Sequence, residues 1–152
     1  MYLKTAIILT WLPVSYVLLV FYADTLLTAA LAAFALAQGF ILLGLNIMHD
    51  GNHGSYSSNK TINQIMGFTL DLAGGSKLIW RQKHNILHHT YTNINGVDED
   101  LHTSGILRLS PNQEKRSWHR FQHLYAVLPY GFLTLAWVLT NDMKKLVSGR
   151  IL

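Results

Sequence analysis

Two long stretches without a charged residue constrain the fold of this chain more than any other feature. Residues 5–22 (TAIILTWLPVSYVLLVFY) and residues 25–47 (TLLTAALAAFALAQGFILLGLNI) contain no Asp, Glu, Lys or Arg. A helix of roughly 20 residues crosses a hydrocarbon core about 30 Å thick, so each stretch is long enough to span a bilayer. Because only Ala23 and Asp24 separate them, we predict an antiparallel pair, an integral membrane helical hairpin.

Two alternatives for these stretches are less consistent with the sequence. A pair of buried core helices in a soluble domain would require two adjacent uncharged runs of this length, which is rare in a small protein. A cleaved signal peptide over residues 1–22 would have a shorter apolar run and small residues at its cleavage site. The whole chain is also poor in charge, because 13% of its 152 residues are charged, against roughly 25% in ordinary soluble domains.

The net charge is +4, and the positions of the basic residues favour a membrane protein over a nucleic-acid binder. The basic residues lie between the apolar stretches, whereas a nucleic-acid site would combine them with exposed aromatic residues. Basic loops are typical of the cytoplasmic side of a membrane, so we predict that residues 49–123 form a cytoplasmic helical cap. No nucleic-acid partner is expected. The chain contains no cysteine, which excludes disulfides and thiolate metal sites.

A third uncharged stretch, residues 124–140, poses a conflict of orientation. It is interrupted by Pro129 and Gly131 and is followed by Lys144 and Lys145. A full crossing would place these lysines on the outside, against the positive-inside tendency. We predict a third membrane segment bent at Pro129. Two possibilities stay open: the segment is re-entrant, or a further helix follows downstream.

Five histidines lie in two tight clusters. His49 and His53 belong to the motif H-D-G-N-H, and His84, His88 and His89 belong to H-N-I-L-H-H. A spacing of four places two imidazoles on one face of a helix, and imidazole binds first-row transition metals well. His89 is rotated by about 100° from His88 on an α-helix and could reach a second ion. The alternative for each cluster is a polar helix face at the membrane surface.

The number of histidines points to two metal ions. Asp50 follows His49, so the first cluster alone could mimic the H-E-x-x-H motif of zinc hydrolases. Five imidazoles, however, exceed the three protein ligands of a catalytic zinc site. A pair of redox-active iron ions fits the donor set better.

The sequence around these clusters resembles the membrane fatty-acid desaturases. M-H-D-G-N-H-G-S and W-R-Q-K-H-N-I-L-H-H-T-Y-T-N-I-N-G-V-D-E-D are similar to the acyl-lipid and linoleoyl-CoA desaturase-like branch, with residues 49–53 matching its first histidine box and residues 84–89 its second. Residues 117–126 resemble the stretch that follows the second box. The resemblance extends over most of residues 40–142.

The resemblance implies a fatty acid desaturase with a non-haem di-iron centre on the cytoplasmic side of the membrane. Such an enzyme inserts a cis double bond into a fatty acyl chain, carried on a lipid, on CoA or on a carrier protein. It uses dioxygen as co-substrate and two external electrons from a ferredoxin or a cytochrome b5. The implied iron ligands are His49, His53, His84, His88 and His89. Ligating histidines need hydrogen-bond acceptors behind them, and the candidates are Asp50, Asn85, Asp98 and Asp100.

One departure from the family pattern limits the prediction. The third histidine box of the family, H/Q-x-x-H-H, does not occur in these 152 residues. His119 and His123 have the spacing of a ligand pair, but their surroundings match the stretch after the second box, so we do not expect them to bind metal. We therefore expect a single, incomplete all-α desaturase domain that belongs to a longer enzyme. The alternatives are a lipid hydroxylase on the same scaffold and an inactive, truncated metal-binding membrane fragment.

Overall fold

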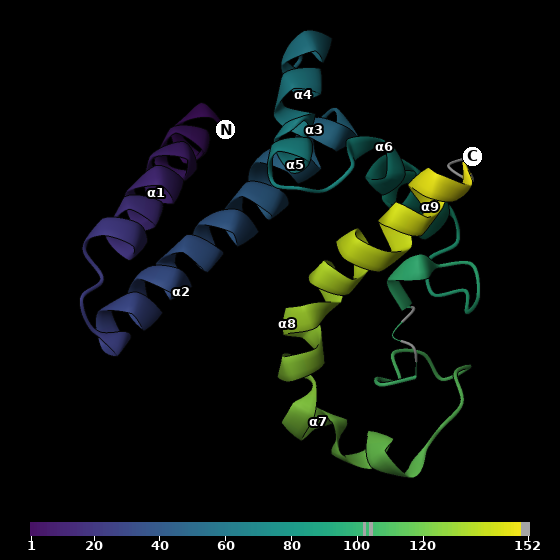
Figure 1. The fold of residues 1–152 in the computed structure, drawn as a ribbon. Coiled ribbons are helices and arrows are strands. Elements are labelled where there is room, and N and C mark those ends of the chain that lie inside the picture. The colour runs from purple at the N-terminus through teal and green to yellow at the C-terminus, as the bar shows by residue number, and fades with distance from the viewer. Residues whose placement is uncertain (102, 104, 150–152) are drawn as a thin grey trace. The chain divides into compact units, whose positions relative to one another are not determined.

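The computed structural model describes residues 1–101, 103 and 105–149. These residues form α-, π- and 3-10 helices joined by turns, and no strand occurs among them. The all-α prediction is therefore confirmed for the part of the chain that the structure describes (Figure 1). The chain divides into two compact units, residues 1–74 and residues 75–152, which are described separately.

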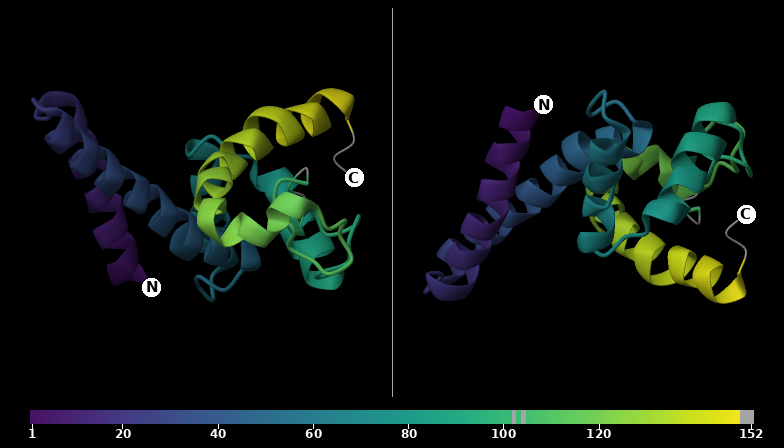
Figure 2. Two further views of the ribbon diagram at one scale, coloured as in Figure 1. Left: turned by 90° about the horizontal axis from the view of Figure 1, so that it is seen from below. Right: turned by 90° about the horizontal axis from the view of Figure 1, so that it is seen from above.

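The first unit begins with two long helices, α1 (Tyr2–Phe21) and α2 (Leu26–Leu42). The side chain of Thr25 caps α2 by accepting a hydrogen bond from the Thr28 N–H at 3.2 Å. The helices pack side by side and antiparallel (Figures 1 and 2). Nε1 of Trp11 on α1 donates to the Ala35 carbonyl on α2 at 2.7 Å and links the two helices. A Cβ atom at Gly39 would lie 2.8 Å from the Leu12 side chain, so a larger residue would have to displace that side chain.

The second helix does not end before the first histidine cluster. It continues through a π-helical turn, η1 (Leu43–Met48), into α3 (His49–His53). Gly54 then ends the helix in the left-handed conformation with φ of 73°, a conformation that glycine adopts without strain. His49 and His53 consequently lie on a continuous helix that extends beyond residue 47, the last residue of the predicted span.

The two long helices have the length and composition of membrane spans. Residues Tyr2–Phe21 have a mean hydropathy of 1.8 and residues Leu26–His53 a mean hydropathy of 2.2 in their most apolar stretches. Only 17% of each of these stretches is buried within the protein. In a soluble domain such apolar helices would be mostly covered by other elements, so the exposed side chains indicate faces that are suited to lipid.

A small hydrophobic core lies at the end of the helix pair that is opposite the turn between α1 and α2. Ile8, Leu43 and Ile47 pack with Tyr56, which follows α3. The Tyr56 hydroxyl forms a buried 2.6 Å hydrogen bond with Oγ1 of Thr5. The unit is completed by two short helices, α4 (Lys60–Gly67) and α5 (Thr69–Leu72).

The second unit consists of short helices around a long turn-rich segment. In chain order these are α6 (Lys77–Trp80), the π-helix η2 (Arg81–His88), the 3-10 helices η3 (Glu99–Leu101) and η4 (Ser117–Phe121), α7 (Gln122–Tyr125), α8 (Val127–Ala136), the π-helix η5 (Trp137–Asp142) and α9 (Met143–Ser148). The second histidine cluster lies at the end of η2.

The helical run over residues 122–148 is interrupted at Ala126, between α7 and α8. Pro129 has no N–H to donate to the Tyr125 carbonyl, and its ring would clash with that carbonyl in a continuous α-helix. The predicted bend therefore falls one turn before the proline.

Candidate metal centre

The first histidine cluster lies on α3. The rings of His49 and His53 pack edge to face with their centroids 4.4 Å apart. Nδ1 of His49 lies 3.4 Å from a carboxylate oxygen of Asp50, which was one of the acceptors expected from the sequence. The two imidazoles thus share one face of the helix, as their spacing predicts.

The face of α3 that is opposite the two imidazoles packs against α4. A Cβ atom at Gly51 would lie 2.6 Å from the backbone nitrogen of Gly67, and Nδ2 of Asn52 donates to the Gly67 carbonyl at 3.4 Å. Because His49 and His53 each lie two residues from Gly51, they are roughly 200° around the helix from it. The close contact at Gly51 therefore directs both imidazoles away from α4.

We expect Gly51→Ala to lower the free energy of unfolding by about 1–3 kcal/mol, because the added methyl group collides with backbone atoms that have no room to move. The same change should reduce iron binding at His49 and His53. The matched control is Gly44→Ala on η1, where a Cβ atom meets nothing within 4 Å. Thermal unfolding of both variants in detergent measures the difference, and equal melting temperatures would contradict the predicted contact.

The second cluster gathers three imidazoles on a π-helical turn. The rings of His84 and His88 are stacked with an interplanar angle of 14° and centroids 5.2 Å apart. The His89 ring packs edge-on against both, at 4.8 Å from His84 and 5.5 Å from His88. Trp80 stacks on the other side of His84 at 4.4 Å. The residues predicted as ligands within this cluster are therefore neighbours in space.

The position of His89 differs from the α-helical expectation. The His89 N–H donates to the His84 carbonyl, five residues earlier, which is the hydrogen bond of a π-helix. Because a π turn closes between residues five apart, His89 comes round towards the face of His84, closer than an α-helix would bring it. The sequence contained no signal of this winding.

A buried carboxylate lies behind His88. The side chain of Asp98 accepts from Nδ1 of His88 at 3.1 Å, from the Asn93 N–H at 2.9 Å and from the Asp100 N–H at 3.0 Å. Burial would raise the pKa of Asp98, but these hydrogen bonds outweigh it and hold the pKa below its ordinary value. Since an ionised carboxylate can only accept, His88 carries its proton on Nδ1 and presents Nε2 on its far side.

A compact turn brings Asp98 to this position. Asn93 adopts a left-handed conformation with φ of 65°, and Gly96 one with φ of 86°; asparagine and glycine are the residues that tolerate such angles best. The Asp98 N–H then donates to the Ile94 carbonyl at 2.9 Å. The stretch T-N-I-N-G-V-D-E-D thus folds back onto the helix that precedes it, so the acidic turn is not a freely solvated loop.

Asp100 lies between the other groups of the cluster. Its Oδ2 is 3.5 Å from Nδ1 of His84 and 3.4 Å from Nδ1 of His88, and its Oδ1 is 3.6 Å from Nζ of Lys83. Burial lowers the pKa of Lys83, although Asp100 and Glu99 act in the opposite direction. The sequence analysis missed this buried lysine; its only signal was a basic residue directly before the first histidine of the motif.

These residues fit a transition metal by geometry and by chemistry. His84, His88 and Asp100 each offer one ligand atom, and these atoms lie within 4.8 Å of one another. Imidazole nitrogens with a nearby carboxylate suit iron among other first-row metals. For His88, the hydrogen bond from Nδ1 to Asp98 fixes the tautomer and leaves Nε2 as the donor atom, which is the usual arrangement of a metal-bound histidine.

His119 is engaged in the fold. Its Nδ1 accepts from the Arg116 N–H at 3.1 Å, and its Nε2 donates to the Gly105 carbonyl at 3.0 Å. With both ring nitrogens bonded to backbone, this histidine links η4 to an earlier turn. His123, on α7, is exposed. In this arrangement both ring nitrogens of His119 are already occupied by backbone partners.

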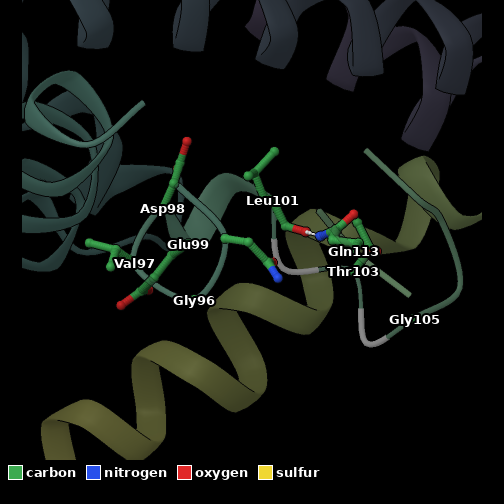
Figure 3. Close-up of a pocket in the computed structure, with 9 residues that line it drawn as sticks. Gly96, Val97, Asp98, Glu99, Leu101, Thr103, Gly105 and Gln113 are labelled. Atoms are coloured by element: carbon green, nitrogen blue, oxygen red, sulfur yellow. Dashed lines mark hydrogen bonds between the residues drawn. The ribbon is translucent and has the colours of Figure 1, made fainter. Parts of the chain in front are cut away.

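A cavity of about 360 Å³ lies beside the acidic turn (Figure 3). Its walls include Val97, Glu99 and Leu101, and Nε2 of Gln113 donates across it to the Leu101 carbonyl at 2.8 Å. The Asp98 and Glu99 side chains leave the turn in different directions (Figure 3). None of the five clustered histidines lines this cavity.

In the part of the chain that the structure describes, the fold and the site define a helical protein with clustered histidines and two long apolar helices that suit a membrane. The family model for fatty acid desaturases matches residues 24–149, and the chain belongs to the fatty acid desaturase family.

Curated relatives support this assignment. The chain is 43% identical to an sn-1 linoleoyl-lipid 6-desaturase of Arthrospira platensis, over 93% of this chain and 38% of the relative. It is 42% identical to an sn-1 linoleoyl-lipid 6-desaturase of Synechocystis, over 99% and 42%, and 36% identical to an acyl-lipid (8-3)-desaturase of Physcomitrium patens, over 99% and 32%. The chain thus spans about two fifths or less of the length of these relatives. No solved structure gives a significant match.

Proposed function

We propose that this chain contributes two of the three histidine boxes of a membrane-bound non-haem di-iron fatty acyl desaturase. The observation that carries the proposal is the second cluster, where three imidazoles gather at the end of η2 and two carboxylates contact the Nδ1 atoms of His84 and His88. Membership of the desaturase family supports it. Relatives that are named for desaturating acyl chains of lipids favour a lipid-linked acyl substrate.

In this proposal α1 and α2 cross the membrane as a hairpin, and residues 49–123 lie on the cytoplasmic side. The exposed apolar faces of both helices support the crossing, and the basic residues of the intervening region support the orientation. His49, His53, His84, His88 and His89 then hold two iron ions close to the inner face of the bilayer, where an acyl chain can reach them.

The bound irons supply the redox chemistry that couples dioxygen to removal of hydrogen from the acyl chain. The overall reaction converts CH₂–CH₂ to cis CH=CH while dioxygen, two external electrons and two protons form two waters. A ferredoxin or a cytochrome b5 is the proposed source of the electrons. The chain's own residues orient the donor atoms: Asp98 keeps the proton of His88 on Nδ1, and the stacking of Trp80, His84 and His88 keeps their rings nearly parallel.

A lipid hydroxylase on the same scaffold is the closest alternative, because it requires the same histidines. Mass spectrometry of lipids after reaction with the full-length enzyme separates the two: a desaturase product has lost two hydrogen atoms, and a hydroxylase product has gained one oxygen atom. We expect the first result, and a product that carries added oxygen would contradict it.

A truncated, inactive fragment is the other alternative. The coding sequence beyond codon 152 decides this question. An in-frame H/Q-x-x-H-H motif downstream supports the enzyme, and an immediate stop codon supports the fragment.

A further inference from the structure

The chain that leaves the first histidine cluster turns back onto the helix that carries it. Gly54 ends α3, and the N–H groups of Ser55 and Tyr56 then both donate to the Asp50 carbonyl, at 2.9 and 3.2 Å. Asp50 is the residue next to His49 in the motif H-D-G-N-H. The backbone of Ser55 and Tyr56 is therefore joined to the helical turn that holds the two imidazoles.

The side chain of Tyr56 connects this turn to α1. Its ring is buried in one core with Ile8 of α1 and with Leu43 and Ile47 of η1. Its hydroxyl shares the 2.6 Å hydrogen bond with Oγ1 of Thr5, which is buried as well. A buried tyrosine hydroxyl needs a polar partner, and Thr5 supplies it. Tyr56 thus contacts α1 through both its ring and its hydroxyl.

Thr5 is a polar residue on an otherwise apolar face of α1. Thr5 and Ile8 are three residues apart and share one face of the helix; both are buried, whereas Ile7 and Leu9 are exposed. An unpaired hydroxyl in such apolar surroundings is costly. The hydrogen bond between Thr5 and Tyr56 is therefore a specific polar contact within an apolar interface.

Two further contacts join the first turn of α1 to the same region. The Tyr2 hydroxyl lies 3.4 Å from Oγ of Ser57, and the Tyr2 ring packs edge to face with Tyr56 at a centroid distance of 5.8 Å. Nζ of Lys4 donates to Oδ1 of Asn46 at 3.3 Å. The start of α1 lies at the same end of the helix pair as α3 (Figure 1). In the sequence, α1 thus contacts the chain both before and after the first histidine cluster.

The turn that carries Tyr56 is held in one conformation by Asn63 of α4. Nδ2 of Asn63 donates to the carbonyls of Gly54 and Ser57 at 3.0 and 2.7 Å, and its Oδ1 accepts from the Ser57 N–H at 2.8 Å. Because these backbone groups are bonded, a displacement of Tyr56 is passed to α3 instead of being absorbed by a loose loop.

We propose that Thr5 and Tyr56 are positioning residues for the first histidine cluster. Their hydrogen bond fixes the axial position and the rotation of α3 against α1, and so fixes where His49 and His53 present their imidazoles. A functional site requires its ligands within about 0.5 Å of the productive geometry, so a small shift of α3 is enough to weaken binding. The inference rests on the proposed function for the bound iron.

Variants that remove or keep single hydroxyl groups test the link. Thr5→Val and Tyr56→Phe each remove one hydroxyl with little change in size. We expect each to weaken iron binding by the full-length protein about tenfold, at the lower end of the effects of outer contacts at metal sites. Thr5→Ser keeps the hydroxyl and should bind iron as tightly as the unaltered protein. Affinity is measured by competition with a chelator, which requires no catalytic activity.

The double variant Thr5→Val, Tyr56→Phe separates positioning from stability. Each single variant leaves one buried hydroxyl without its partner, which lowers the melting temperature. The double variant leaves none, and replacing both partners by apolar groups of the same shape is nearly neutral, so its melting temperature should return towards that of the unaltered protein. Its iron affinity should stay reduced, because the link is absent. An affinity that recovers together with the melting temperature would overturn the positioning role.

The matched controls are Thr10→Val and Tyr16→Phe, which make the same changes on exposed side chains of α1 and should leave the iron affinity unchanged. The inference fails if the Thr5 and Tyr56 variants bind iron as tightly as these controls. The double variant also decides the question where a single variant does not fold. Failure of the proposed function gives a different result, because the unaltered full-length protein would then bind no iron after reconstitution.

Discussion

Replacing His88 and His89 together with alanine is expected to abolish iron binding at the second histidine cluster. The double variant removes two of the three imidazoles that gather on η2 and leaves His84 with Asp100 as nearby donors. Two donors from the protein do not hold a ferrous ion against water and chelators, because affinity depends on the number and softness of the ligands. Elemental analysis of the purified full-length protein after reconstitution measures the loss as iron bound per chain.

The control for this prediction is His123→Ala. His123 is exposed on α7, so its loss should change neither the iron content nor the fold. Circular dichroism of both proteins establishes that helical content is retained. If the His88→Ala, His89→Ala protein kept a full complement of iron, the metal centre would have to lie elsewhere in the chain.

Asp98→Asn is expected to have the second largest effect, on both stability and metal binding. Three N–H groups converge on the Asp98 carboxylate, which is 3% exposed. An amide of the same shape has one acceptor oxygen, so at least one of these donors loses its partner in a buried site. That loss costs about 1–3 kcal/mol of the free energy of unfolding. Iron affinity should fall about 10–100-fold, since the tautomer of His88 is no longer fixed.

Two measurements separate the roles of Asp98. Thermal unfolding reports the loss of stability, and ¹⁵N chemical shifts of the His88 ring in the iron-free protein report which nitrogen carries the proton. Glu114→Gln is the matched control, because this carboxylate is 75% exposed. A His88 ring that keeps its proton on Nδ1 in Asp98→Asn, with unchanged iron affinity, would exclude the orienting role.

The parts of the fold that follow from local chemistry were predictable from the sequence. The uncharged stretches at residues 5–22 and 25–47 predict long helices because few other structures satisfy their backbone groups in lipid, and α1 and α2 agree with them. The spacing of His49 and His53 predicts a shared face, which the structure has. Asp50, Asp98 and Asp100 were expected to face histidines, and each lies within 3.5 Å of a histidine nitrogen.

The remainder depends on contacts that no local pattern encodes. The π-helical winding at η1 and η2 has no compositional signature, so the wider turn that brings His89 beside His84 was not predictable. The charges that oppose the effect of burial on the pKa of Lys83 include one that lies far along the chain, Asp142. The Lys145–Glu99 pair joins residues 46 apart, so no local pattern predicts it.

The π-helical turn of η2, which carries the second cluster, limits how the histidine motif can be transferred to another protein. On a straight α-helical scaffold, H-N-I-L-H-H would present His84 and His88 together and turn His89 away from His84, since residues five apart there are separated by about 140° around the axis. The grouping of the three imidazoles therefore depends on the π-helical turn as well as on the residues themselves. A graft that copies the six residues without the hydrogen bond from the His89 N–H to the His84 carbonyl would reproduce the sequence of the site but not the position of its third imidazole.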